Sequence, residues 1–103
     1  MRAALRLYQA QKVLLPRLSF YGKSGECMLC DQAKQVLLEV EDEAPHSVEW
    51  IDITDPREKE AFDEYKWDIP VLHLNGKEIM RHRFDAKKLV KLLHESQTTV
   101  GKG

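Results

Sequence analysis

Residues 18–40 read LSFYGKSGECMLCDQAKQVLLEV, and this stretch holds two elements joined at a pair of cysteines. Residues 18–21 predict a short strand and residues 23–26 a loop. From Cys27 onward, apolar residues recur at helical spacing, which predicts a helix. The residues on its apolar face are Leu29, Ala33, Val36, Leu37 and Val40. The spacing Cys-x-x-Cys at a strand–helix junction is typical of a thiol redox motif.

The two cysteines of this motif occupy different positions on the predicted helix. Cys27 stands at its N-terminus, where free backbone N–H groups and the macrodipole favour a thiolate. Cys30 lies one turn further, close enough to form a disulfide, and its more buried position suits it to resolve a mixed disulfide. The pair could instead be two core residues or half of a zinc site. A zinc site needs four ligands, and no second cysteine pair or spaced histidine pair exists. We therefore favour catalytic redox use of Cys27 and Cys30, with no metal.

The remaining elements follow from hydrophobic periodicity and turn signals. They are a strand at 48–53, a helix capped by Thr54 or Asp55, a strand at 71–74, a turn at Asn75-Gly76, a strand at 78–83 and a helix capped by Asp85. The order β-α-β-α-β-β-α makes the first two strands parallel and the last two an antiparallel hairpin. This pattern predicts an α/β fold, a four-stranded mixed sheet with helices on both faces. Within it, we interpret Trp50 as a core residue and place Arg81 and Arg83 on one face of the last strand.

Composition and charge narrow the class of protein. The chain has 103 residues, 43% of them hydrophobic and 32% charged, which is typical of one soluble globular domain. No apolar run approaches the ~20 residues that span a bilayer, so we expect no membrane association. The formal net charge of −1 gives no reason to expect nucleic acid as a partner. We place the domain at residues 17–96 and a disordered tail at 97–103.

Residues 1–16 are basic, and no acidic residue precedes Glu26. Such a start is found in mitochondrial transit segments, and equally in a basic terminus that leads into a first strand. We favour the second interpretation. The small number of cysteines indicates a reducing compartment. The expected location is therefore cytoplasmic or mitochondrial.

Ile69-Pro70-Val71, at the start of the third predicted strand, is the second chemical signal. A proline cannot donate to a sheet ladder, so it belongs at a strand start or edge. The common interpretation is a trans proline that ends a helix. Its place between a helix and a hairpin favours a cis bond here, which leaves the backbone of Ile69 free to face a ligand.

With these anchors, the chain resembles the glutaredoxin-like branch of the thioredoxin superfamily. The resemblance covers residues 18–93 and rests on Cys-x-x-Cys and on DIPVLHLNG at residues 68–76. It implies a thioredoxin fold, Cys27 as the nucleophile, a cis Pro70 and glutathione as a candidate co-substrate. It also implies a monomer that needs no cofactor and acts on protein disulfides or glutathione mixed disulfides.

The sequence departs from typical glutaredoxins around the glutathione site. Lys23 stands four residues before Cys27 instead of three, and the usual Gly-Gly segment is replaced by residues 82–85. We expect the substrate pocket to consist of Lys23, Cys27, the backbone of Ile69 beside Pro70, and the turn at residues 83–85. In it, Lys23 and Arg83 would hold carboxylates and Asp85 an amine.

These departures, and the carboxylate of Glu26 beside Cys27, keep a second function class open. The alternative is a non-enzymatic thioredoxin-fold interaction module. A related alternative is an iron–sulfur cluster bridged between two copies by Cys27 and glutathione, since one chain offers too few thiolates alone. We favour a glutaredoxin-like thiol–disulfide oxidoreductase.

Overall fold

The computed structural model describes residues 15–102, and a four-stranded sheet organises them. Its strands are β1 (Arg17–Gly22), β2 (Ser47–Asp52), β3 (Val71–Leu74) and β4 (Lys77–Arg81), in the spatial order β2-β1-β3-β4. β1 runs parallel to β2 and antiparallel to β3, and β3 pairs antiparallel with β4. The mixed sheet predicted from the element order is thereby confirmed.

A tight turn joins β3 to β4 at Asn75 and Gly76. Their φ angles are 50° and 88°, the left-handed conformation that this residue pair adopts at low cost. The Asn75 side-chain oxygen accepts the N–H of Arg17 at 3.0 Å, and the Asn75 N–H donates to the Arg17 carbonyl at 2.8 Å. The turn therefore also fixes the start of β1.

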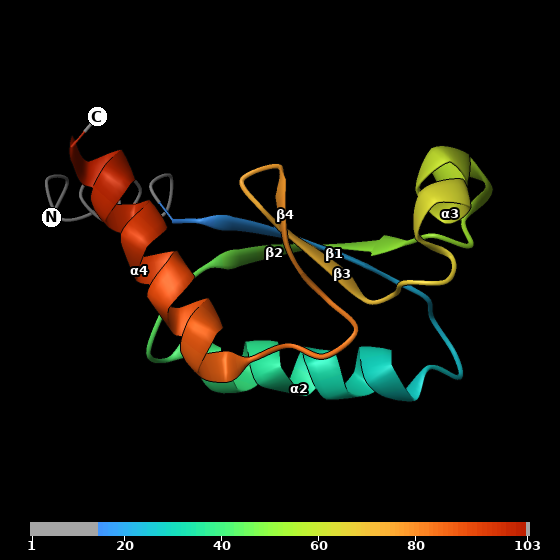
Figure 1. Ribbon diagram of the computed structural model, residues 1–103, viewed down its shortest axis with the longest axis horizontal. Coiled ribbons are helices and arrows are strands. Elements are labelled where there is room, and N and C mark those ends of the chain that lie inside the picture. Colours follow the sequence, from blue (N-terminus) through green and yellow to red (C-terminus); the bar gives the residue numbers. More distant parts are fainter. Residues whose placement is uncertain (1–14, 103) are drawn as a thin grey trace, which may run out of the picture.

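The helices cover the two faces of the sheet unequally. They are α2 (Met28–Glu41), the 3-10 turn η1 (Pro56–Glu58), α3 (Lys59–Tyr65) and α4 (Ala86–Lys102). α2 and α4 pack on one face, and α3 lies on the other (Figure 1). Side chains alternate along β1, so Phe20 faces α2 and α4 while Tyr21 contacts Tyr65 of α3, with ring centroids 5.3 Å apart.

The hydrophobic core fills the space between the sheet and the α2–α4 layer. Its fully buried side chains come from the central strands and from the inner faces of both helices. They include Leu18, Phe20, Leu72, Ala33, Leu37, Val40, Leu89 and Leu93. On the opposite face, Tyr65 is the one buried residue of α3. Val71, which pairs with Tyr21, and Ile53, which lies beside α3, are also buried outside the main core cluster, so this face carries a smaller apolar layer next to the aromatic contacts.

Three expectations are corrected by the structure. β4 ends at Arg81, because His82 has a φ of 62° and leaves the extended conformation, so Arg83 is not on the strand with Arg81. α4 continues to Lys102 where a disordered tail was expected from residue 97, and no glycine or proline interrupts it before Gly101. Trp50 is 54% exposed, because β2 is an edge strand and leaves part of its ring uncovered.

The predicted basic extension at 1–16 falls almost wholly on residues 1–14, which lie outside the described part of the chain. Pro16, at its end, is fully buried, and its carbonyl accepts the N–H of Ser47 at 3.0 Å. Within residues 15–102, no helix combines the length and apolar character needed to cross a membrane.

Candidate redox site

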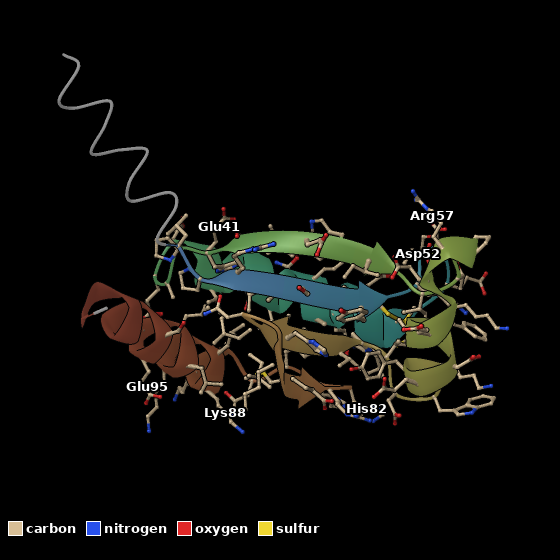
Figure 2. All side chains as sticks on the ribbon, turned by 90° about the horizontal axis from the view of Figure 1, so that it is seen from above. Glu41, Asp52, Arg57, His82, Lys88 and Glu95 are labelled. Carbon is tan, nitrogen blue, oxygen red and sulfur yellow. A yellow bond between two sulfur atoms is a disulfide. The ribbon has the colours of Figure 1, made fainter. Side chains whose placement is uncertain are left out.

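Cys27 and Cys30 form a disulfide at the carboxyl end of β1, with their Cα atoms 5.2 Å apart. Cys27 is the N-cap of α2 in extended conformation, and its sulfur accepts the N–H of Cys30 at 3.2 Å. Figure 2 shows the disulfide between the labelled Asp52 and His82 in that view. The predicted position of the motif at the strand–helix junction is thus confirmed.

The two sulfur atoms differ in their access to solvent. Cys27 is half-buried, whereas Cys30 is 0% exposed and belongs to the core. Gly22 contributes to this burial, because a Cβ at that position would lie 3.3 Å from the Cys30 sulfur. A molecule in solution therefore meets Cys27 first.

The loop that leads to Cys27 is held by the carboxylate of Asp52. This carboxylate accepts the Ser24 hydroxyl at 2.5 Å and, through its other oxygen, the Thr54 hydroxyl at 2.6 Å and the Thr54 N–H at 2.8 Å. These hydrogen bonds, the one from Ser24 first, lower the pKa of Asp52 to about 2. Asp52 is therefore charged at neutral pH and ties the β1–α2 loop to the end of β2.

The Ile69–Pro70 peptide bond is cis, as the sequence predicted. Pro70 is fully buried, and its carbonyl accepts the N–H of His82 at 2.8 Å. Ile69 and Cys27 both pack, partly buried, against the same core cluster. The residue before the cis proline and the more accessible cysteine of the disulfide therefore pack against the same hydrophobic core.

A charged network surrounds this peptide. Arg81 forms salt bridges with Glu78 and, at 3.0 Å, with Asp68, the residue before Ile69. The hydrogen bond from Arg81 lowers the pKa of Glu78 and raises the pKa of Arg81 itself. The Arg81 guanidinium also lies over the Tyr65 ring, 5.7 Å from its centroid. Asp68 is thus paired within the chain, although partly exposed.

The three predicted polar pocket residues lie in different places. Asp85 caps α4, since its carboxylate accepts the N–H of Lys88 at 3.1 Å. Arg83 is exposed in the segment between β4 and α4. Lys23 lines a cleft beside β2 together with Trp50. Lys23 and Arg83 therefore lie near opposite edge strands of the sheet, while Arg83 and Asp85 share one segment.

Sequence reasoning missed the Asp52 contacts and the Arg81 network. The pattern Asp52-x-Thr54 is a local signal for a side-chain-capped turn and could have been used. Ser24 and Asp68 gave no such signal, because their partners are distant in sequence and become neighbours only through strand pairing.

Comparison with known proteins is consistent with this geometry. The Glutaredoxin-like domain family (DUF836) matches residues 17–94. A protein described as a glutaredoxin-like protein YDR286C homolog, from Dictyostelium discoideum, is 38% identical over 74 residues, which cover 68% of this chain and 68% of that protein.

Solved structures show the same fold. A structural genomics target protein, XcR50 from X. campestris, superimposes with a TM-score of 0.62 at 28% identity, covering 76% of this chain and 96% of that one. A mutant thioredoxin from Halobacterium salinarum gives a TM-score of 0.60 at 17% identity, with 88% and 82% coverage. Since the family match spans both the cysteine pair and the cis proline, this chain belongs to the glutaredoxin-like (DUF836) family, with a thioredoxin-like fold.

Proposed function

We propose that this protein is a thiol–disulfide oxidoreductase that uses Cys27 as nucleophile and Cys30 as resolving thiol. The observation that carries the proposal is the asymmetric pair: one sulfur at a helix N-terminus within reach of solvent, the other fully buried one turn further. Two buried structural cysteines would not differ in this way. The helix N-terminus also favours the thiolate that attacks disulfides.

The exchange has two balanced steps. The Cys27 thiolate attacks one sulfur of a substrate disulfide, forms a mixed disulfide and releases the other sulfur as a thiolate, which takes up a proton. Cys30, as its proton leaves, attacks the Cys27 sulfur, forms the Cys27–Cys30 disulfide and releases the second substrate thiol. The substrate gains two electrons and two protons, and two molecules of a thiol such as glutathione restore the dithiol.

Protein disulfides and glutathione mixed disulfides are the proposed substrates. The backbone beside Pro70 supplies main-chain bonds that do not depend on the side chain of Ile69. Exposed Arg83 supplies a cation for a glutathione carboxylate. Asp85 supplies a charge for the amine, although one of its oxygens already caps α4. Because these charges are exposed, we expect weak and salt-sensitive glutathione binding.

The test is turnover of a glutathionylated peptide and of insulin disulfides by the reduced protein. We expect Cys27→Ser to abolish both reactions. Cys30→Ser should retain the glutathionylated peptide reaction when glutathione is the reductant, because glutathione can then resolve the mixed disulfide. The proposal fails if the fully reduced wild-type protein turns over neither substrate.

The same assay separates the roles of Asp85. Asp85→Asn keeps a side-chain oxygen for the helix cap but removes the charge offered to the glutathione amine. We expect it to raise the KM for the glutathionylated peptide and to leave insulin reduction unchanged. Equal effects on both substrates would remove Asp85 from the glutathione site.

A further inference from the structure

Lys23 and Lys34 meet in one cleft beside the redox site. The cleft has a volume of about 240 Å³ and lies between the β1–α2 loop, α2 and edge strand β2. Its wall also contains Gly22, where an added Cβ would lie 3.3 Å from the Cys30 sulfur. The cleft is therefore next to the dithiol, on the β2 side, whereas Pro70 immediately precedes β3, on the other side of β1.

Both lysines are free to take a ligand. Lys23 is exposed and Lys34 half-buried, and neither forms a salt bridge with any residue in the described part of the chain. The arginines Arg57 and Arg81, in contrast, are paired with carboxylates. Two unpaired cations that converge on one cleft favour an anion there.

The cleft is also lined by the partly exposed aromatic ring of Trp50. Trp50 packs on Phe20 with ring centroids 5.1 Å apart, yet the residue is 54% exposed. Large aromatic surfaces next to cations are typical of recognition sites, where the ring supplies apolar contact area. Asp52 also lines the cleft, but its oxygens are directed to Ser24 and Thr54 and leave the cleft with a net positive charge from the lysines.

We propose that this cleft, hereafter the lysine cleft, binds an acidic side chain of the protein substrate whose disulfide Cys27 attacks. The volume admits one or two side chains and not a whole cofactor. A Glu or Asp residue would place its carboxylate between Lys23 and Lys34 and its apolar stem over Trp50. This inference rests on the proposed function, because it names the class of disulfide that the dithiol prefers.

We expect the acidic residue of the substrate to occupy one position relative to the substrate cysteine. Glu26, in the β1–α2 loop, and Asp31, in the first turn of α2, are exposed carboxylates on either side of the cysteine motif in sequence, and they would repel a carboxylate directed toward them. We therefore expect Glu to help on only one side of the substrate cysteine. General attraction to acidic proteins would not show this dependence on position.

The test uses short peptide disulfides that carry one Glu or one Gln, placed before or after the cysteine. Rates of mixed-disulfide formation are measured with the Cys30→Ser variant, which cannot resolve the product. We expect one position at which the Glu peptide reacts about three-fold faster than the Gln peptide, as for an exposed ion pair. In Lys34→Gln and Lys23→Gln this preference should fall toward one.

Two variants separate a local site from net charge. Lys34→Glu should reverse the preference, so that a peptide with Lys at the same position reacts faster than its Glu counterpart. Lys91→Gln removes one positive charge in the same way, at an exposed position of α4 that does not line the lysine cleft, and should leave the preference intact. A preference that survives Lys34→Gln, or is lost in Lys91→Gln, would overturn the inference.

A binding measurement distinguishes this inference from the proposed function. In a Cys27→Ser, Cys30→Ser variant, the Glu peptide should shift the NMR signal of the Trp50 indole N–H, and the Gln peptide should not. If this shift occurs while the wild-type protein reduces no peptide, the proposed function fails and the lysine cleft stands. If reduction proceeds at rates independent of Glu, the lysine cleft alone fails. Displacement of the peptide by glutathione disulfide would assign the site to glutathione and overturn the protein-substrate inference.

Discussion

The sulfur atoms of Cys27 and Cys30 differ in access, which makes their reactivities separable. Cys30 is 0% exposed, and Cys27 is half-buried at the start of α2. In the reduced protein we expect iodoacetamide to alkylate Cys27 at least about tenfold faster than Cys30. Mass spectrometry of timed samples measures both rates, and in denaturant the difference should disappear. Equal rates in the folded protein would contradict the assigned roles.

Gly22, the last residue of β1, lies close to the disulfide. A Cβ there would lie 2.6 Å from a ring carbon of buried Phe20 and 3.3 Å from the Cys30 sulfur. We expect Gly22→Ala to destabilise the protein by about 1–3 kcal/mol, because the core must shift to admit the methyl group.

Urea denaturation measures this loss, and Gly25→Ala is the matched control. At Gly25 no atom lies within 4 Å of an added Cβ, but φ is +91°. We expect this control to lose only about 1 kcal/mol from backbone strain. If Gly22→Ala were as stable as the wild type, the Phe20 ring and the core around it could move to admit the methyl group without loss of stability.

At this scale the sequence predicted individual residues well when their signal was local. The cysteine motif, the Asp85 cap and the Asn75-Gly76 turn each depend on neighbours within a few positions, and each was found. Lys23 and Trp50 were harder, because the cleft that they share forms only after β1 and β2 pair.

Among the elements, α4 depends on one residue for its start. The Asp85 carboxylate accepts the Lys88 N–H at 3.1 Å, and the Asp85 carbonyl accepts the Leu89 N–H at 2.9 Å. We expect Asp85→Ala to reduce the free energy of unfolding by about 1 kcal/mol, whereas Asp85→Asn should lose less, since asparagine caps helices well. Thermal unfolding of the two variants checks this, and equal losses would mean that the charge matters more than the hydrogen bond.

The β1–α2 loop depends on the ionised form of Asp52. Its folded pKa of about 2 lies below the ordinary value of 3.8, so its contribution to stability is fully present above pH 4 and is lost as the pH falls toward 2. We expect Asp52→Asn to be less stable than the wild type at neutral pH, by about 1 kcal/mol. The difference should shrink as the pH falls from about 4 to about 2.

Chemical denaturation of both proteins across this pH range measures the difference. Other carboxylates with lowered pKa values, such as Glu78, are present in both proteins and cancel in the comparison. A difference that stays constant with pH would show that the Asp52 charge does not hold the loop.

The spacing of apolar residues predicted which helices and strands exist and in what order. Where each strand ends is decided instead by its pairing with neighbouring segments. Residues 78–83 alternate as a strand should, yet β4 stops at Arg81 because His82 turns to bond the Pro70 carbonyl. This hydrogen bond joins residues twelve positions apart, and the local sequence around neither residue predicts it. The sequence therefore indicated which residues could pair and not which pairs would form.

Across the whole molecule, the two faces of the sheet are held by unequal amounts of buried surface. α2 buries four residues on its face, Cys30, Ala33, Leu37 and Val40, whereas α3 buries Tyr65. The Tyr65 ring packs against Tyr21 in a tilted arrangement, and its hydroxyl lies 2.9 Å from Nε2 of His73. Because local stability follows buried apolar contact, α3 should open without global unfolding.

We therefore expect the amides of α3 to exchange with solvent deuterium faster than those of α2 and the central strands. Tyr65→Ala removes the one buried side chain of α3 and should accelerate exchange in α3 and in residues 66–69, which lead to the cis proline, while α2 keeps its protection. Tyr65→Phe keeps the ring contacts and loses only the bond to His73, so its effect should be smaller. Hydrogen-exchange mass spectrometry resolves these segments. Uniform acceleration over the whole chain would show instead that Tyr65 supports the global fold, and that the segment before Pro70 cannot adapt independently to a substrate.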